Sequence, residues 1–244
     1  MKKTMLITVP ILRRASFALA LLVAAAAAHA QNAPAADSAQ NPAAATPAQG
    51  APAESGQNAS PDVLVKSVSD QVLDIIRSDK DIRAGNQKKV MDLVQEKILP
   101  HFDFLRMTGL AVGPAWRKAT PDQRTRLQEQ FRILLVRTYS SGLSAYRNQT
   151  IDYKPLHANP ADNEVLVRSE VKQASAEPVS IDYRMARTPE GWKVYDVAIG
   201  GVSLVTTYRD SFGQEVRQNG VDGLIKSLEE KNRQLEEQSQ RASR

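Results

Sequence analysis

The stretch WKVYDVAIGGVSLVTTYRDSF, Trp192–Phe212, constrains the fold more than any other part of the chain. Its first half alternates as a strand does, and apolar residues on both faces near its end predict burial on both sides. The pair Gly200–Gly201 then breaks the strand. Apolar residues at helical spacing follow from Val202 to Phe212. This segment therefore passes from sheet to helix, and we expect a space walled by both beside it.

The first thirty residues have the parts of an export signal. Four basic residues accompany an apolar run, Phe17–Ala28, which is too short to span a bilayer. A small-x-small cleavage site follows at Ala28–Ala30. The pattern predicts a cleaved signal peptide over residues 1–30 and a mature chain that begins at Gln31, with an uncleaved membrane anchor as the alternative.

Removal of the signal changes the charge balance of the protein. The whole chain has 32 basic and 27 acidic residues, and four of the basic ones lie in residues 1–30, which leaves 28 against 27, or +1. A near-neutral mature protein gives little support for nucleic-acid binding. The chain has no cysteine, so neither a disulfide nor a cysteine-linked lipid is available to it. We expect a soluble protein of the bacterial periplasm.

Composition divides the mature chain into three parts. Residues 31–60 are rich in Ala and Pro and lack aromatic and branched aliphatic side chains, so a disordered arm is predicted. Residues 61–228 carry the periodic apolar patterns of a folded domain. Residues 229–244 are charged and Gln-rich with few apolar anchors, which predicts a tail that frays into solvent.

Helical patterns fill the first half of the domain. Ser60 and Pro61 are typical of a helix start, and the helix that follows has one apolar face. Further helices are predicted over Gln87–Leu99, before Pro100, and over His101–Val112. Thr120 begins a capping box for a long helix, which we expect to extend to about residue 147.

The pattern changes to alternation after residue 148 and becomes helical again at the end. Strands are predicted over Thr150–Pro155, Glu164–Lys172, Val179–Met185 and Trp192–Ile199. Short turns between them indicate a four-stranded antiparallel meander with one wet face. The predicted order is helices first, then strands, then helices again. This order is typical of an α+β domain and not of one built from βαβ units.

Polar chemistry is sparse in this sequence. His101 and His157 have no second ligand at metal-binding spacing, so no metal site is predicted. No nucleophile motif or phosphate-binding loop is present. Asp103 and Ser203 are better placed to cap helices than to react. A buried pair between Asp196 and Arg209 at the junction of sheet and helix would be structural or would serve acid/base chemistry, and the residues alone leave this open.

Several short motifs occur in order over about Pro61–Leu228. They are Leu99-Pro100-x-Phe102-Asp103-Phe104, Gly113-x-x-Trp116, Phe131-x-x-x-Leu135-x-x-Thr138-Tyr139, Trp192-Lys193-Val194-Tyr195-Asp196-Val197 and Gly201-Val202-Ser203-Leu204-Val205-x-x-Tyr208-Arg209-x-x-Phe212. Together they resemble the MlaC family, also called the toluene-tolerance auxiliary family. The resemblance implies a twisted, NTF2-like antiparallel sheet packed against helices, with an apolar lipid cavity between them.

The resemblance also implies a function. MlaC proteins are periplasmic carriers that bind glycerophospholipid as cargo, with no cofactor. They move it between an outer-membrane lipoprotein/porin complex and an inner-membrane ABC transporter complex, which maintains lipid asymmetry. We therefore expect a monomeric carrier and not an enzyme. A cavity that shelters acyl chains must be apolar, and our candidates for its lining are Leu135, Tyr139, Leu143, Val167, Ile181, Tyr183, Val197, Val202, Leu204 and Tyr208.

Two alternatives stay open at this point. One is an NTF2-like periplasmic enzyme of the isomerase or dehydratase type, which would need an acid/base pair inside the cavity. The other is an adaptor that binds only proteins, for which a filled interior is expected. The direction of transport, the headgroup preference and the docking surfaces do not follow from the sequence.

Overall fold

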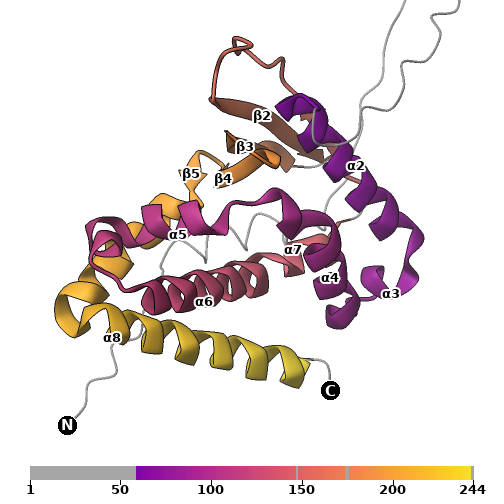
Figure 1. Cartoon of the computed structure of the whole chain (residues 1–244). Helices are drawn as coiled ribbons and strands as arrows, with labels where there is room; N and C mark the ends of the chain where they lie inside the picture. The colour runs from indigo at the N-terminus through magenta and orange to yellow at the C-terminus, as the bar shows by residue number, and fades with distance from the viewer. Residues whose placement is uncertain (1–58, 147, 174–175, 243–244) are drawn as a thin grey trace, which may run out of the picture.

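The computed structural model describes residues 59–146, 148–173 and 176–242, so the predicted signal peptide and nearly all of the predicted arm lie outside the described residues. The chain forms an antiparallel sheet with helices before and after it, which confirms the α+β prediction (Figure 1). The helical segments are α2 Pro61–Ser78, α3 Lys80–Arg83, α4 Gln87–Leu93, η1 Val94–Ile98, η2 Leu99–His101, α5 Phe104–Val112, η3 Gly113–Arg117, α6 Pro121–Tyr139, α7 Ser141–Ser144 and α8 Leu204–Ala242.

Side-chain caps fix where the helices begin. The Thr120 hydroxyl accepts from the Gln123 amide, and the Gln123 side chain returns to the Thr120 amide, which is the predicted capping box of α6. Asp103 accepts from the Arg106 amide at 2.8 Å and so caps α5. Helix α6 ends at Tyr139, earlier than predicted, because the Ser- and Gly-rich residues after it favour a separate short helix.

The sheet has five strands and not the predicted four. They are β1 Thr150–Tyr153, β2 Glu164–Gln173, β3 Ala176–Thr188, β4 Gly191–Ile199 and β5 Val202–Ser203, each antiparallel to the next in the order β1–β5. Sequence reasoning missed β5 because it has only two residues. Gly200 and Gly201 both have positive φ, 56° and 79°, so the turn reverses the chain and returns it to pair with β4.

Helix α8 is bent and longer than expected. Gly220 adopts φ 71° and ψ −177°, a conformation open to glycine, and divides α8 into two arms. We expected residues 229–244 to fray, but the helix continues through Ala242. Buried Asn232 donates to the Gln130 carbonyl oxygen at 2.9 Å, and Leu235 packs on the core. These contacts hold the second arm against α6.

The core lies on two sides of the sheet (Figure 1). Helices α5, α6 and α8 form one layer, where the rings of Phe131, Tyr208 and Phe212 lie with centroids 5.1–5.4 Å apart. Helix α2 covers the opposite face of the sheet and packs on buried side chains that include Met185 and Val194. The far end of α2 continues this packing against α3 and α4. Helix α2 and the α5–α6–α8 layer thus pack on different faces of the sheet, and their two clusters meet at Phe102.

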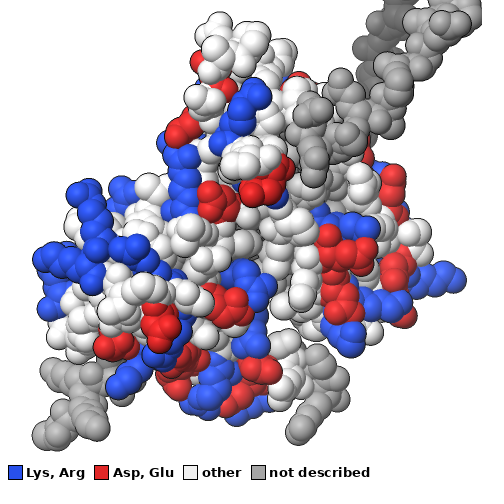
Figure 2. Space-filling model, in the orientation of Figure 1, with Lys and Arg blue, Asp and Glu red and all other residues white. Residues whose placement is uncertain are grey.

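Charges are mixed over the surface. In Figure 2 acidic and basic side chains alternate over most of the face, and a basic group gathers over η3 and the start of α8. Within the described ranges no helix is both long and apolar enough to cross a membrane.

Candidate functional site

The candidate site lies between α2 and the sheet. Helical spacing places Val65, Val68 and Val72 on the face of α2 that points to the sheet. Strand alternation places Ile181, Tyr183 and Met185 on one face of β3, toward α2. Part of the space between these two apolar faces is empty.

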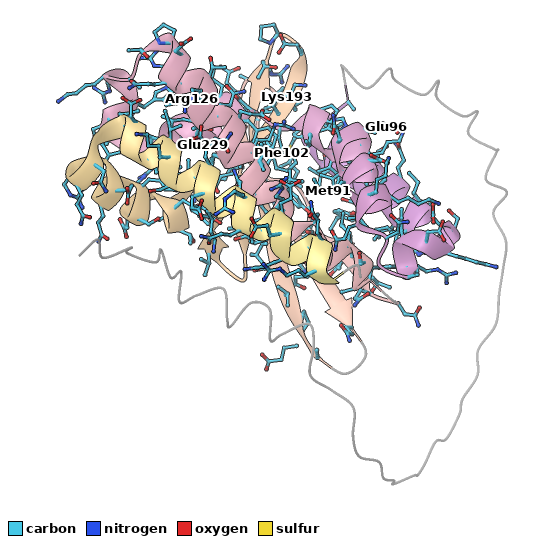
Figure 3. The ribbon with its side chains drawn as sticks, turned by 90° about the horizontal axis from the view of Figure 1, so that it is seen from below. Met91, Glu96, Phe102, Arg126, Lys193 and Glu229 are labelled. Carbon is cyan, nitrogen blue, oxygen red and sulfur yellow. The ribbon has the colours of Figure 1, made fainter. Side chains whose placement is uncertain are left out.

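A third segment closes this space at one end. The Asp103 amide donates to the Val194 carbonyl oxygen at 2.8 Å, which fixes the residues before α5 along the edge of β4. Phe102 is thereby held at the junction of the α2–α4 helices and the α5–α6–α8 layer (Figure 3). Its ring stacks on Phe104 with centroids 5.7 Å apart. Phe102 therefore forms part of the wall.

The cavity has a volume of about 230 Å³. Its lining is almost wholly apolar and consists of Leu64, Val65, Val68, Ser69, Val72, Leu73, Ile98, His101, Phe102, Leu143, Ile151, Ile181, Tyr183, Met185 and Val194. No carboxylate, lysine or arginine is among these residues. The space therefore suits an apolar ligand better than a charged one.

The two titratable groups in the lining are neutral at pH 7. Burial lowers the pKa of His101 below its usual 6.5, and the nearby Lys193 ammonium lowers it further. Burial raises the pKa of Tyr183 to about 12. Tyr183 lies deep in the protein and still has some accessible surface, because its side chain borders the cavity. The cavity wall thus carries hydrogen-bonding groups but no formal charge.

The acidic residues singled out in the sequence have structural partners outside the cavity. Asp196 accepts from the Ser203 hydroxyl at 2.7 Å and from the Val205 amide at 3.2 Å, at the start of α8. The suggested pair with Arg209 does not form, because Arg209 donates to the Leu110 carbonyl oxygen and the cation near Asp196 is Arg184, at 3.7 Å. Asp103 caps α5. Among the described residues no group of three or more acidic or His side chains is placed to hold a metal ion.

Three of the ten candidate lining residues, Leu143, Ile181 and Tyr183, border the cavity. Three more lie in the same apolar cluster between α2 and the sheet without bordering the space: Val167, Val197 and Leu204. Three pack on the other side of the sheet with the α5–α6–α8 layer: Leu135, Tyr139 and Tyr208. The tenth, Val202, is 44% exposed on β5.

Most of the α2 side of the wall was missed by sequence reasoning. The apolar face predicted for this helix includes Val65, Val68 and Val72, but nothing in the pattern marks it as the wall of a cavity. A stripe of branched aliphatic residues has the same pattern whether it faces a filled core or a cavity. No signal in the sequence separates the two.

A second hollow lies at the N-terminal end of α2. It has a volume of about 570 Å³ and is lined in part by the polar side chains of Asn159, Arg187 and Thr188. Arg187 also lies over the ring of Trp192, at 4.8 Å from its centroid. This larger hollow is formed mostly by turns at the surface, and its wall includes the charged Arg187, so it suits an apolar ligand less well than the uncharged cavity.

Comparison with known proteins gives one family and several relatives. Residues 66–230 match the family model described as MlaC protein. The chain is 25% identical to toluene tolerance protein ttg2D of Pseudomonas putida, over 67% of this chain and 76% of that protein. It is 21% identical to the intermembrane phospholipid transport system binding protein MlaC of Haemophilus influenzae, over 70% and 81% respectively.

A solved structure is also similar. It is that of a phospholipid-binding protein from Ralstonia solanacearum in complex with a phospholipid. The TM-score is 0.69, the sequence identity is 45%, and the match covers 72% of this chain and 99% of the other.

Proposed function

The chain belongs to the MlaC family, and from this premise we propose that it is a periplasmic carrier that binds a glycerophospholipid with its acyl chains between α2 and the sheet. The observation that carries the proposal is the uncharged apolar cavity of about 230 Å³. The phospholipid bound to the similar Ralstonia solanacearum protein supports the choice of ligand. An adaptor with a filled interior is less consistent with this cavity.

The energetics explain why a carrier needs such a space. Burying one CH₂ group is worth about 0.8 kcal/mol, so two chains of roughly sixteen carbons would cost on the order of 25 kcal/mol in water. A protein that moves a phospholipid through water must therefore enclose its chains. The charged headgroup gains nothing from burial and is expected to stay at the surface.

The cavity must widen when the lipid enters. Pockets for small ligands usually have volumes of about 300–1,000 Å³, and the space of about 230 Å³ lies below this range. Helix α2 is the wall best able to move, because no backbone hydrogen bond joins its described residues to a strand. At its C-terminal end Arg77 donates to the Tyr146 hydroxyl at 2.7 Å, so this end is held more firmly. We propose that the N-terminal end of α2 swings away from the sheet.

The finer parts of the proposal concern the pathway. We propose that the mature protein is a monomer with an NTF2-like domain that exchanges lipid between an outer-membrane lipoprotein/porin complex and an inner-membrane ABC transporter complex. The name of the Haemophilus influenzae relative, which refers to intermembrane phospholipid transport, supports this. The chain is proposed to reach the periplasm by means of residues 1–30. An enzymatic role is not favoured, because of the three candidate acid/base groups, Asp103, His101 and Asp196, only His101 borders the cavity, and no carboxylate lines the cavity to pair with it.

A bulky substitution in the cavity wall tests the proposal. Val68 lines the cavity, so Val68→Trp should fill much of the space and lower the phospholipid seen by native mass spectrometry after mild purification by tenfold or more. The matched control is Val63→Trp on the same helix, because Val63 is 53% exposed and borders the outer hollow instead. Loss of lipid in the control alone, or no lipid in the wild type, would contradict the proposal.

A further inference from the structure

Hydroxyl groups gather at one part of the cavity wall and directly beside it. Ser69 of α2 and Tyr183 of β3 border the cavity. Tyr153 of β1 lies directly opposite Ser169 of β2 in the sheet, and Ser169 lies opposite Ile181, so these side chains share the face that points to α2. The Ser69 hydroxyl neighbours both phenols. Tyr153 and Ser169 do not themselves line the cavity, but they lie next to Ser69 and Tyr183, so hydroxyls from one helix and three strands gather beside an otherwise apolar wall.

The hydroxyl groups of this cluster differ in whether they donate a hydrogen bond within the protein. Ser69 donates to the Val65 carbonyl oxygen at 2.7 Å, and Ser169 donates to the Ile181 carbonyl oxygen at 2.9 Å. The Tyr153 hydroxyl oxygen is buried and finds no hydrogen-bond partner within the described part of the chain. Burial raises the pKa of Tyr153, so the phenol keeps its proton at neutral pH. A buried donor without an acceptor is unfavourable, and such a group calls for a partner outside the protein chain.

The hydroxyl cluster lies close to the protein surface. The Lys66 ammonium is 5.6 Å from the centroid of the Tyr153 ring, and its side chain is 58% exposed beside Asp70. Apart from Ser69, Tyr183 and His101, the lining residues are apolar. A phospholipid has the same order of parts, because its ester groups lie between the hydrocarbon chains and the charged headgroup. The hydroxyl cluster therefore matches the ester region in both position and chemistry.

We propose that the Tyr153 hydroxyl, with Tyr183 beside it, donates a hydrogen bond to an acyl-ester carbonyl oxygen of the bound phospholipid. This inference rests on the proposed function and adds the part of the ligand that the protein recognises. The carbonyl oxygen is a strong acceptor, and an ether oxygen in its place offers no carbonyl to the phenol. The protein should accordingly distinguish diacyl lipids from dialkyl ether lipids that have the same chains and headgroup.

The test is a competition between two lipids. The mature protein is incubated with vesicles that contain equal amounts of diacyl and dialkyl ether phosphatidylethanolamine with sixteen-carbon chains, and the bound lipids are quantified by native mass spectrometry. The wild type should prefer the diacyl form by about three- to tenfold, the range that one neutral hydrogen bond provides. Tyr153→Phe should reduce this ratio to near one, and Tyr183→Phe should reduce it in part.

The matched control is Tyr195→Phe. The Tyr195 hydroxyl donates to the Glu164 carboxylate at 2.9 Å, and Tyr195 packs with the α5–α6–α8 layer and does not line the cavity. Its loss should leave the ratio at the wild-type value. Tyr153→Phe removes a hydroxyl without a partner, so its melting temperature should equal or exceed that of the wild type.

The outcomes separate this inference from the proposed function. Binding of neither lipid by the wild type would overturn the proposed function and the inference with it. Equal binding of both lipids by the wild type would overturn only the inference. An unchanged preference in both Tyr153→Phe and Tyr183→Phe would also overturn it, because the partner of the phenol would then be a water molecule or another group.

Discussion

Replacement of Asp196 by alanine should lower stability and leave lipid binding intact. The carboxylate is 5% exposed and accepts hydrogen bonds from the Ser203 hydroxyl and the Val205 amide, which begin α8. Each hydrogen bond to a charged group contributes about 1.5–3 kcal/mol to the free energy of unfolding. The substitution recovers part of this loss, because the variant no longer has to desolvate a buried charge when it folds. The free energy of unfolding should therefore decrease by about 3 kcal/mol. For a domain of this size that corresponds to a fall in melting temperature of about 6–12 °C.

Calorimetry or thermal circular dichroism measures the stability, and native mass spectrometry below the transition measures bound phospholipid. Asp210→Ala is the control, because Asp210 is exposed on the same helix and should shift the melting temperature by no more than about 2 °C. A double-mutant cycle with Ser203→Ala should show coupling of about 1–2 kcal/mol, since Ser203 joins Asp196 to the Thr206 amide. Unchanged stability together with lost lipid binding would refute a structural role for Asp196 and would favour the acid/base alternative.

Two further predictions concern pH and backbone conformation. The pKa of His101 is lower in the folded protein than its usual 6.5, so the unfolded chain binds more protons as the pH falls. The free energy of unfolding should therefore decrease as the pH drops below about 6.5 and through the folded pKa. In urea unfolding at pH 5 and 7, His101→Gln should reduce this difference between the two pH values. Gly220→Ala should destabilise the protein by more than about 1 kcal/mol, because φ is 71°, whereas Gly142→Ala within α7 should be neutral or stabilising in the same assay.

The elements of this fold follow from local patterns, and the sheet's extra strand does not. Thr120 and Asp103 begin helices in the structure as their sequence contexts predict, since a cap satisfies amides within the same turn. The pairing of β5 depends on two glycines with positive φ, and two residues carry too little alternation to be recognised. The extent of α8 was also missed, because its anchor, Asn232, binds Gln130 of another helix.

The lining of the candidate cavity follows from the sequence less completely than the fold does, for a physical reason. Tyr139 and Tyr208 belong to the same kind of apolar pattern as Tyr183, yet the first two pack behind the sheet and the third borders the cavity. Periodicity gives the face of an element that is buried, but not the element it is buried against. The assignment of each apolar face therefore required the arrangement of α2 and α8 on opposite sides of the sheet.

The division of the apolar residues between two sides of one sheet explains how a stable protein can keep an empty space. The α5–α6–α8 layer contains tightly packed rings, with Phe131 and Phe212 at most 1% exposed, and it has no need to move. The α2 side is held mainly by branched aliphatic side chains, which slide more easily than interlocked rings, and by the contact of Arg77 with Tyr146 at one end. In the proposed carrier, stability and opening would thus depend on different faces of the sheet. A ligand that widens the α2 side need not disturb the layer that keeps the domain folded.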